Sequence, residues 1–238
     1  MKVPLYKIYW DEDDVNHVLE VIRQGSYWAT GPNIQKFEAM LAELIGRKHA
    51  VAFNSGTSAL HAMLLAYKIK AGAEVIVPSF TFIATANSVL FTEAKPVFAD
   101  IEDETFGLDP ENVAEKITKK TKAIMPIHYG GSGCRIRELQ ELAEDHQVLL
   151  LEDAAESLGA KVDGRPVGSA GDSAMFSFCG NKVITTGEGG MIVTDSRDIY
   201  ERLKLIRSHG RLETENYFTS AKVMDYVALG FNWRMSNI

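Results

Sequence analysis

The sequence predicts an α/β fold in which a mostly parallel β-sheet lies between layers of helices. Segments with apolar residues at helical spacing alternate along the chain with short runs that are almost entirely apolar. Short apolar runs of this kind are typical of strands buried on both faces, which is the situation of a parallel sheet covered by helices. Gly, Asp or Pro separates the segments, and this alternation favours strand–helix–strand units.

The individual elements follow from the spacing of the apolar residues. Apolar positions three and four apart place one face of a helix against the core, and they predict helices at residues 15–22, 34–45, 60–69, 113–117, 136–143 and 199–206. The strand-like runs are residues 50–53, 74–77, 96–99, 123–127, 148–151, 174–178 and 191–194. Seven such runs predict a seven-stranded sheet.

Composition excludes several classes of protein. The 238 residues include 25 Lys and Arg against 32 Asp and Glu, a net charge of −7, and 46% are hydrophobic. This apolar content supports a large core and argues against disorder. The acidic balance argues against a nucleic-acid-binding or anionic-membrane surface. The two cysteines, Cys134 and Cys179, form no CxxC pair, so a zinc site, or any other metal site of that kind, and a disulfide framework have no support.

The two ends of the chain differ from the middle. Residues 1–30 form a predicted arm with several aromatic side chains, which either wraps over a partner or a site or simply caps the core. Residues 31–238 form the predicted α/β domain. The final residues, GFNWRMSNI, contain no helix stop signal and no closing strand, so we expect the chain to be a fragment of a longer protein. The first residues lack an apolar signal-peptide segment, which favours a cytoplasmic protein.

Ligands of open α/β sheets bind beyond the carboxyl ends of the strands. The first such place is residues 54–58, Asn-Ser-Gly-Thr-Ser, which lead from a strand into a helix. Their hydroxyls and first-turn amides suit a phosphate, although Ser and Thr are also ordinary helix caps. The second is residues 78–82, where Phe80 and Phe82 either cover a flat ring or pack in the core.

Charged residues follow two further strands. Glu152, Asp153 and Glu156 come directly after a buried strand, where carboxylates are costly unless they are paired. They are candidates for holding a cationic ligand atom or a metal, and one of them is explained equally well as a cap. Lys182 follows residues 174–178, and an amine withdrawn from water there would act as a nucleophile, whereas the alternative is an ordinary surface lysine.

Together these groups fit pyridoxal phosphate (PLP), which has a phosphate, a flat ring, a ring nitrogen that pairs with a carboxylate, and an aldehyde that reacts with a lysine. Two other ligand motifs are absent from the sequence. No GxGxxG follows a strand, and there is no GxxxxGK[ST]. The pattern therefore favours PLP over a dinucleotide or a P-loop nucleotide.

With these groups in this order, the sequence resembles the DegT/DnrJ/StrS-type family of nucleotide-sugar aminotransferases. The matching blocks, in chain order, are NSGTSAL, PSFTFIATAN, EDAAES, FSFCGNK and TTGEGG. The resemblance runs from Gly31-Pro32 to Asn232-Trp233-Arg234 and is greatest for perosamine-synthase-like members. It implies the aspartate-aminotransferase fold, also called PLP fold type I, of which this chain would be the large domain. The resemblance also implies that the smaller C-terminal domain of the family is missing from this chain.

The resemblance also implies roles for individual residues. Lys182 matches the lysine that binds the cofactor as a Schiff base, and Asp153 the acid that pairs with the pyridine nitrogen. Phe82 matches the aromatic residue that stacks on the ring, and Glu156 lies where family members contact the ring hydroxyl. The residues that match phosphate-binding groups are Gly56, Thr57, Ser58 and Ser177.

Asn232 matches an asparagine that reaches the cofactor phosphate of a neighbouring subunit, which implies a homodimer with shared active sites. The implied reaction moves an amino group from an amino acid, glutamate in the family, to a nucleotide-linked keto sugar. A 4-keto-6-deoxy sugar, as in perosamine synthesis for polysaccharide or O-antigen, fits best. Two alternatives stay open: a non-catalytic regulatory or interaction protein on this fold, and another PLP reaction such as sugar dehydration. Dehydratase relatives carry His in place of the lysine, so Lys182 argues against dehydration.

Overall fold

The computed structural model describes residues 2–212 and 223–238. Its main feature is a seven-stranded sheet with the strand order β1-β9-β8-β5-β4-β2-β3, which confirms the seven strands expected from the sequence. All neighbouring strands run parallel except β9, which is antiparallel to β1 and β8. The strands are β1 (His49–Phe53), β2 (Glu74–Pro78), β3 (Lys95–Ala99), β4 (Thr121–Ile124), β5 (Leu149–Asp153), β8 (Ser173–Ser177) and β9 (Gly190–Thr194).

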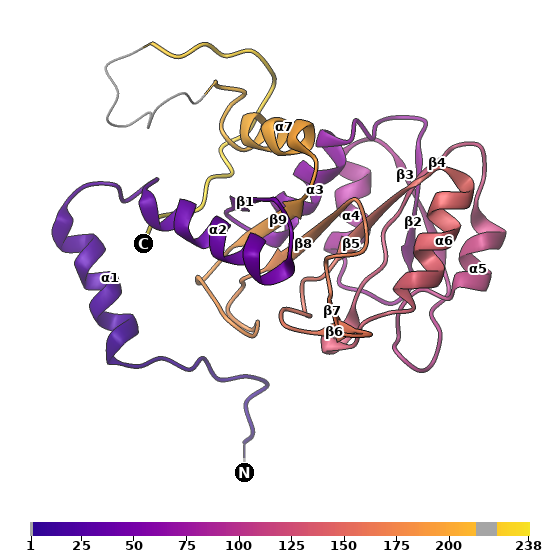
Figure 1. Ribbon diagram of the computed structural model, residues 1–238, viewed down its shortest axis with the longest axis horizontal. Coiled ribbons are helices and arrows are strands. Elements are labelled where there is room, and N and C mark those ends of the chain that lie inside the picture. The colour runs from indigo at the N-terminus through magenta and orange to yellow at the C-terminus, as the bar shows by residue number, and fades with distance from the viewer. Residues whose placement is uncertain (1, 213–222) are drawn as a thin grey trace.

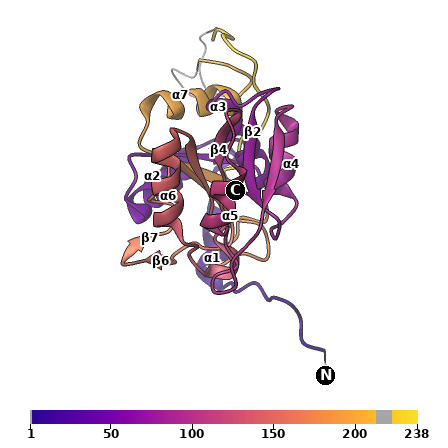
Figure 2. The same cartoon turned by 90° about the vertical axis from the view of Figure 1, so that its right-hand side faces the viewer.

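Helices cover both faces of this sheet (Figure 1). These helices are α2 (Pro32–Ile45), α3 (Gly56–Ala66), α4 (Ala84–Phe91), α5 (Pro110–Lys116), α6 (Ile136–His146) and α7 (Arg197–Arg207). A further helix, α1 (Glu12–Gln24), precedes them in the chain. Successive strand residues point to opposite faces. Val51 therefore belongs to the buried cluster that includes residues of α3, α4 and α7, whereas Ala50 and Ala52 belong to the cluster with α2. Figure 2 shows α4 and α6 on opposite sides of β2 and β4.

Helix α4 and the short strands β6 (Lys161–Val162) and β7 (Arg165–Pro166) were not among the segments expected from apolar spacing. Helix α4 has no polar face to reveal a helical period, because most of its residues are buried, including Thr85 and Ser88. The two-stranded hairpin of β6 and β7 is too short to produce a pattern. No helix within residues 2–212 and 223–238 has the length and apolar character needed to cross a membrane.

The N-terminal segment lies beside the domain rather than in its core. Helix α1 starts with a capping box at Asp11, and Val21 is its one buried residue. Figure 1 shows α1 set apart from the sheet. Beyond α1, the backbone oxygen of Trp28 accepts a hydrogen bond from the amide of Asn237, at 3.0 Å. The two ends of the chain are therefore joined next to the start of α2, while the division at residue 30 stays a prediction.

Candidate active site

The predicted phosphate-binding residues lie at the start of α3, directly after β1. Ser55 is the N-cap of α3, and its hydroxyl accepts a hydrogen bond from the amide of Ser58 at 3.1 Å. The Ser58 hydroxyl donates to Asn54 Oδ1 at 2.6 Å. The cap explanation is thus correct for Ser55. This cap does not use the amides of Gly56 and Thr57. They lie in the first helical turn, where an anion binds favourably.

Close packing brings β8 and β9 against this turn. A Cβ atom at Gly56 would lie 3.2 Å from Cβ of Ser177, so the predicted phosphate ligand Ser177 is adjacent to the turn. A Cβ atom at Gly190 would lie only 2.4 Å from the backbone oxygen of Ser55. Glycine is therefore required at position 190 for the strand to approach the helix start. Gly190 was not singled out from the sequence, although it ends the TTGEGG block.

Asp153, the last residue of β5, carries a buried carboxylate with two hydrogen-bond donors. Thr85 Oγ1 donates at 2.9 Å and the amide of Ala155 at 3.1 Å. Burial raises the pKa of Asp153, opposed by these hydrogen bonds and by the positive charge of Lys182. A cationic ring nitrogen would compensate the buried charge, so the site fits the expected pairing with a pyridinium. Thr85, from α4, is a site residue that sequence reasoning missed.

Lys182 lies in the loop after β8, and its Nζ is 3.3 Å from Oε1 of Glu156. The other oxygen of Glu156 accepts a hydrogen bond from the amide of Gly130 at 3.0 Å. Both side chains are largely shielded from solvent. Glu156 therefore connects the loop that carries Lys182 to the turn after β4. The structure thus brings the two predicted site residues Lys182 and Glu156 together. Lys182 is not an ordinary surface lysine.

The remaining predicted residues have different surroundings. Phe82 follows β2 and is 70% exposed, so the core-packing alternative is wrong for it. Its backbone oxygen accepts a hydrogen bond from Thr85, the partner of Asp153. Asn232 is exposed and pairs through its backbone with Ser208. Its expected partner belongs to a second subunit, so its role stays a prediction.

Glu152, one of the three acids considered from the sequence, does not face the proposed cofactor groups. Glu152 precedes Asp153 in β5, so its side chain points to the opposite face of the sheet. Its carboxylate lies 2.9 Å from Nε2 of His128 and accepts hydrogen bonds from the amides of Gly168, Ala170 and Gly171. No cluster of potential metal-binding side chains occurs among the described residues. The role of Glu152 is therefore structural.

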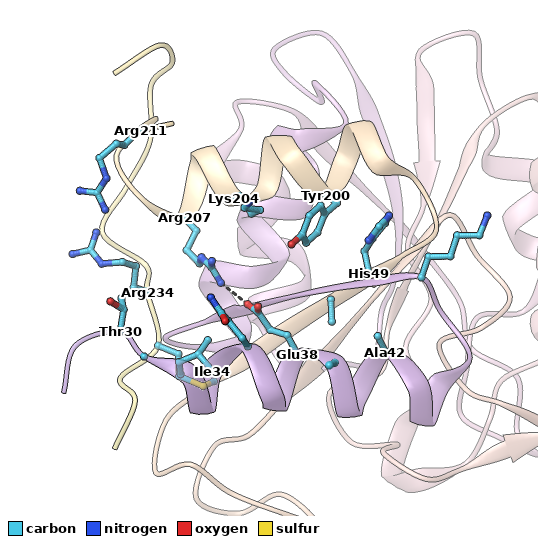
Figure 3. A pocket seen from close by; sticks show the side chains of 16 residues that line it. Thr30, Ile34, Glu38, Ala42, His49, Tyr200, Lys204, Arg207, Arg211 and Arg234 are labelled. Atoms are coloured by element: carbon cyan, nitrogen blue, oxygen red, sulfur yellow. Dashed lines mark hydrogen bonds and ion pairs between the residues drawn. The ribbon is translucent and has the colours of Figure 1, made fainter. Parts of the chain in front are cut away.

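A pocket of about 520 Å³ lies elsewhere, between α2, β1, α7 and the C-terminal segment (Figure 3). Lys48, Lys204 and Arg207 are among its basic side chains, and Arg207 forms an ion pair with Glu38 at 2.6 Å. None of the predicted cofactor-binding residues lines it. The cofactor groups gather instead at the open edge of the sheet, where β1, β2, β5 and β8 end.

Comparison with known proteins agrees with this arrangement. A GDP-perosamine synthase of Caulobacter vibrioides is 44% identical over 228 residues, which cover 96% of this chain and 60% of the relative. An aminotransferase of Psychrobacter cryohalolentis has a similar structure, with a TM-score of 0.90 at 35% identity over 96% of this chain and 59% of the other. A protein of Streptococcus pneumoniae solved in its PLP form has a TM-score of 0.91 at 27% identity, covering 100% of this chain and 64% of the other.

The chain thus spans about three fifths of the length of these relatives. The model of the DegT/DnrJ/EryC1/StrS aminotransferase family matches residues 9–238. This match covers nearly the whole chain and includes every residue assigned to the cofactor site. The chain therefore belongs to the DegT/DnrJ/EryC1/StrS aminotransferase family.

Proposed function

We propose that the protein is a PLP-dependent aminotransferase that moves an amino group from an amino acid to a nucleotide-linked keto sugar. One observation carries the proposal: Lys182, the buried Asp153 and the first turn of α3 are positioned along a single edge of the sheet. These are the groups that a lysine-bound pyridoxal phosphate requires. The family match and the PLP form of the pneumococcal relative support the cofactor.

Each residue has a distinct task in this proposal. The bound cofactor supplies an electron-poor ring that stabilises negative charge on the carbon next to the amino group. Asp153 keeps a proton on the ring nitrogen, and the first turn of α3 binds the phosphate with Ser177. Lys182 removes and returns the proton at the reacting carbon, as a general base and then a general acid. Glu156 orients the lysine amine through the contact at 3.3 Å.

The substrate we propose is a 4-keto-6-deoxy sugar linked to a nucleotide, with glutamate as the amino donor. The GDP-perosamine synthase relative supports this sugar class and favours GDP as the nucleotide. The enzyme would then act in polysaccharide or O-antigen biosynthesis. We place it in the cytoplasm, a reducing compartment that suits the unpaired Cys134 and Cys179. Intact Lys182 disfavours dehydration, and the complete set of cofactor groups disfavours a non-catalytic role.

The decisive experiment is spectroscopic. Purified protein incubated with PLP should show a visible absorbance band that collapses on reduction with borohydride, and the label should map to Lys182. Lys182→Ala should remove the band, whereas Lys161→Ala, at an exposed lysine of the β6–β7 hairpin, should keep it. Glutamate and candidate keto sugars are then tested by product analysis. A folded wild-type sample without the band would refute the proposal.

We further propose a homodimer in which Asn232 completes the phosphate site of the partner. Its support is the resemblance of Asn232 to the family position and its exposure on the described chain. Mixing inactive Lys182→Ala and Asn232→Ala chains should then restore some activity, because one site of each heterodimer would contain both native residues. Heterodimers that form but recover no activity would contradict site sharing.

A further inference from the structure

Three aromatic rings gather at the same edge of the sheet as the proposed cofactor site. Phe80 follows β2, Phe106 lies in the loop after β3, and Tyr129 follows β4. The ring centroids of Phe80 and Tyr129 are 4.7 Å apart, and the Phe106 ring lies 6.2 Å from Phe80 and 6.3 Å from Tyr129. Three separate loops thus contribute to one aromatic cluster. The proposed function assigns no role to these three rings.

This cluster is open to solvent. Phe80 is 44% exposed and Phe106 47% exposed, and neither ring belongs to the buried core. Phe106 has a φ of 59°, a left-handed conformation that is uncommon for a bulky side chain. Tyr129 begins a turn in which Gly130 and Gly131 have φ values of 58° and 88°. Local structure therefore holds large apolar rings at the surface, where grouped exposed rings mark a binding site.

Residues next to the cluster in sequence form hydrogen bonds that lead to the catalytic groups. Gly130, next to Tyr129, donates to Glu156, which contacts Lys182. On the other side, Thr81 follows Phe80 and bonds to Thr85, the partner of Asp153. Strand β2 lies three positions from β8 in the sheet, which is about 14 Å at the usual strand spacing. The cluster therefore lies beside the proposed cofactor site, toward the β4, β2 and β3 side of the sheet.

We propose that Phe80, Phe106 and Tyr129 form the platform on which the nucleobase of the sugar nucleotide stacks. This inference rests on the proposed function, which places the keto sugar near Lys182. The nucleoside end of such a substrate must then lie away from the lysine, at a distance comparable to that between β8 and β2. A flat base fits exposed aromatic rings, because base–aromatic stacking needs only two accessible planar faces.

The test measures binding of GDP to the PLP-loaded protein by titration calorimetry. Phe80→Leu and Phe106→Leu should each weaken GDP binding roughly 5- to 140-fold, the range expected for the loss of one stacked ring. Phe80→Trp keeps a flat ring and should bind GDP like the wild type. Phe98→Leu is the matched control, because Phe98 is 52% exposed in β3 and outside the cluster. Inorganic pyrophosphate, which has no base, should bind equally to all of these variants.

The outcomes separate the two proposals. A wild-type protein that retains no PLP absorbance and transfers no amine would refute the proposed function. PLP-loaded Phe80→Leu and Phe106→Leu proteins with unchanged GDP affinity would refute only the nucleobase platform. An equal loss of affinity in Phe98→Leu, or a parallel loss for pyrophosphate, would also overturn it, because the effect would then not depend on the rings of the cluster.

Discussion

Replacing Glu152 should destabilise the protein in proportion to the hydrogen bonds that each substitution removes. The buried carboxylate has four donors around it. One oxygen accepts from the amides of Ala170 and Gly171, at 3.0 and 2.6 Å, and the other from Gly168 and His128, both at 2.9 Å. The His128 ring donates through Nε2, because its Nδ1 accepts from the amide of Cys134.

The two variants remove different parts of this arrangement. Glu152→Ala leaves four buried donors without an acceptor, and each unsatisfied donor lowers the free energy of unfolding by about 1–3 kcal/mol. Partial hydration of these donors reduces the total loss to about 4 kcal/mol. Glu152→Gln keeps one oxygen and therefore two of the hydrogen bonds, so its expected cost is about 2 kcal/mol. For a chain of this size these losses correspond to decreases in Tm of roughly 8–16 °C and 4–8 °C.

Urea denaturation of both variants measures these losses of unfolding free energy. The control is Glu141→Gln, an exposed position on α6, which should change stability by less than about 0.5 kcal/mol. If Glu152→Gln is as stable as this control, the hydrogen-bond argument is wrong. Burial by itself raises the pKa of Glu152, but the bonds from His128, Gly171 and Gly168 outweigh burial and lower it. The stabilisation is therefore present above about pH 4.3 and disappears as the pH falls through the lower folded pKa.

Three further changes test the cofactor site. Burial raises the pKa of Asp153, so its ionisation costs stability as the pH rises above its unfolded value of about 4. Without cofactor, Asp153→Asn should therefore gain in Tm relative to wild type as the pH rises from about 4, and parallel melting curves would contradict this. Gly190→Ala should weaken PLP binding at least about 10-fold in spectroscopic titrations, because its Cβ would meet the Ser55 backbone at 2.4 Å. Ser55→Ala should lower the unfolding free energy by about 1 kcal/mol through loss of the α3 cap, and urea unfolding at wild-type stability would exclude that role.

The sequence by itself determined the number of strands in the main sheet and the edge of that sheet where the proposed site lies. Strands buried on both faces are mostly apolar, so the inner strands were visible as short apolar runs, and the edge strand β3, which is partly exposed, carries a similar run. Parallel strands end at a common edge, so residues at or after their ends, Asp153 and Lys182 among them, could be placed together without a structure. The ordered motif blocks then identified the family.

The direction of side chains and the contacts between loops were decided only by the tertiary structure. Glu152 and Asp153 are adjacent acids with the same local sequence signal, yet the alternation of the strand sends one to His128 and the other to the cofactor side. Thr85 and Gly190 became site residues because α4 and β9 pack against the strand ends. The cluster of Phe80, Phe106 and Tyr129 comes from three loops distant in sequence. No local pattern records such contacts, because they depend on the order of the strands in the folded sheet.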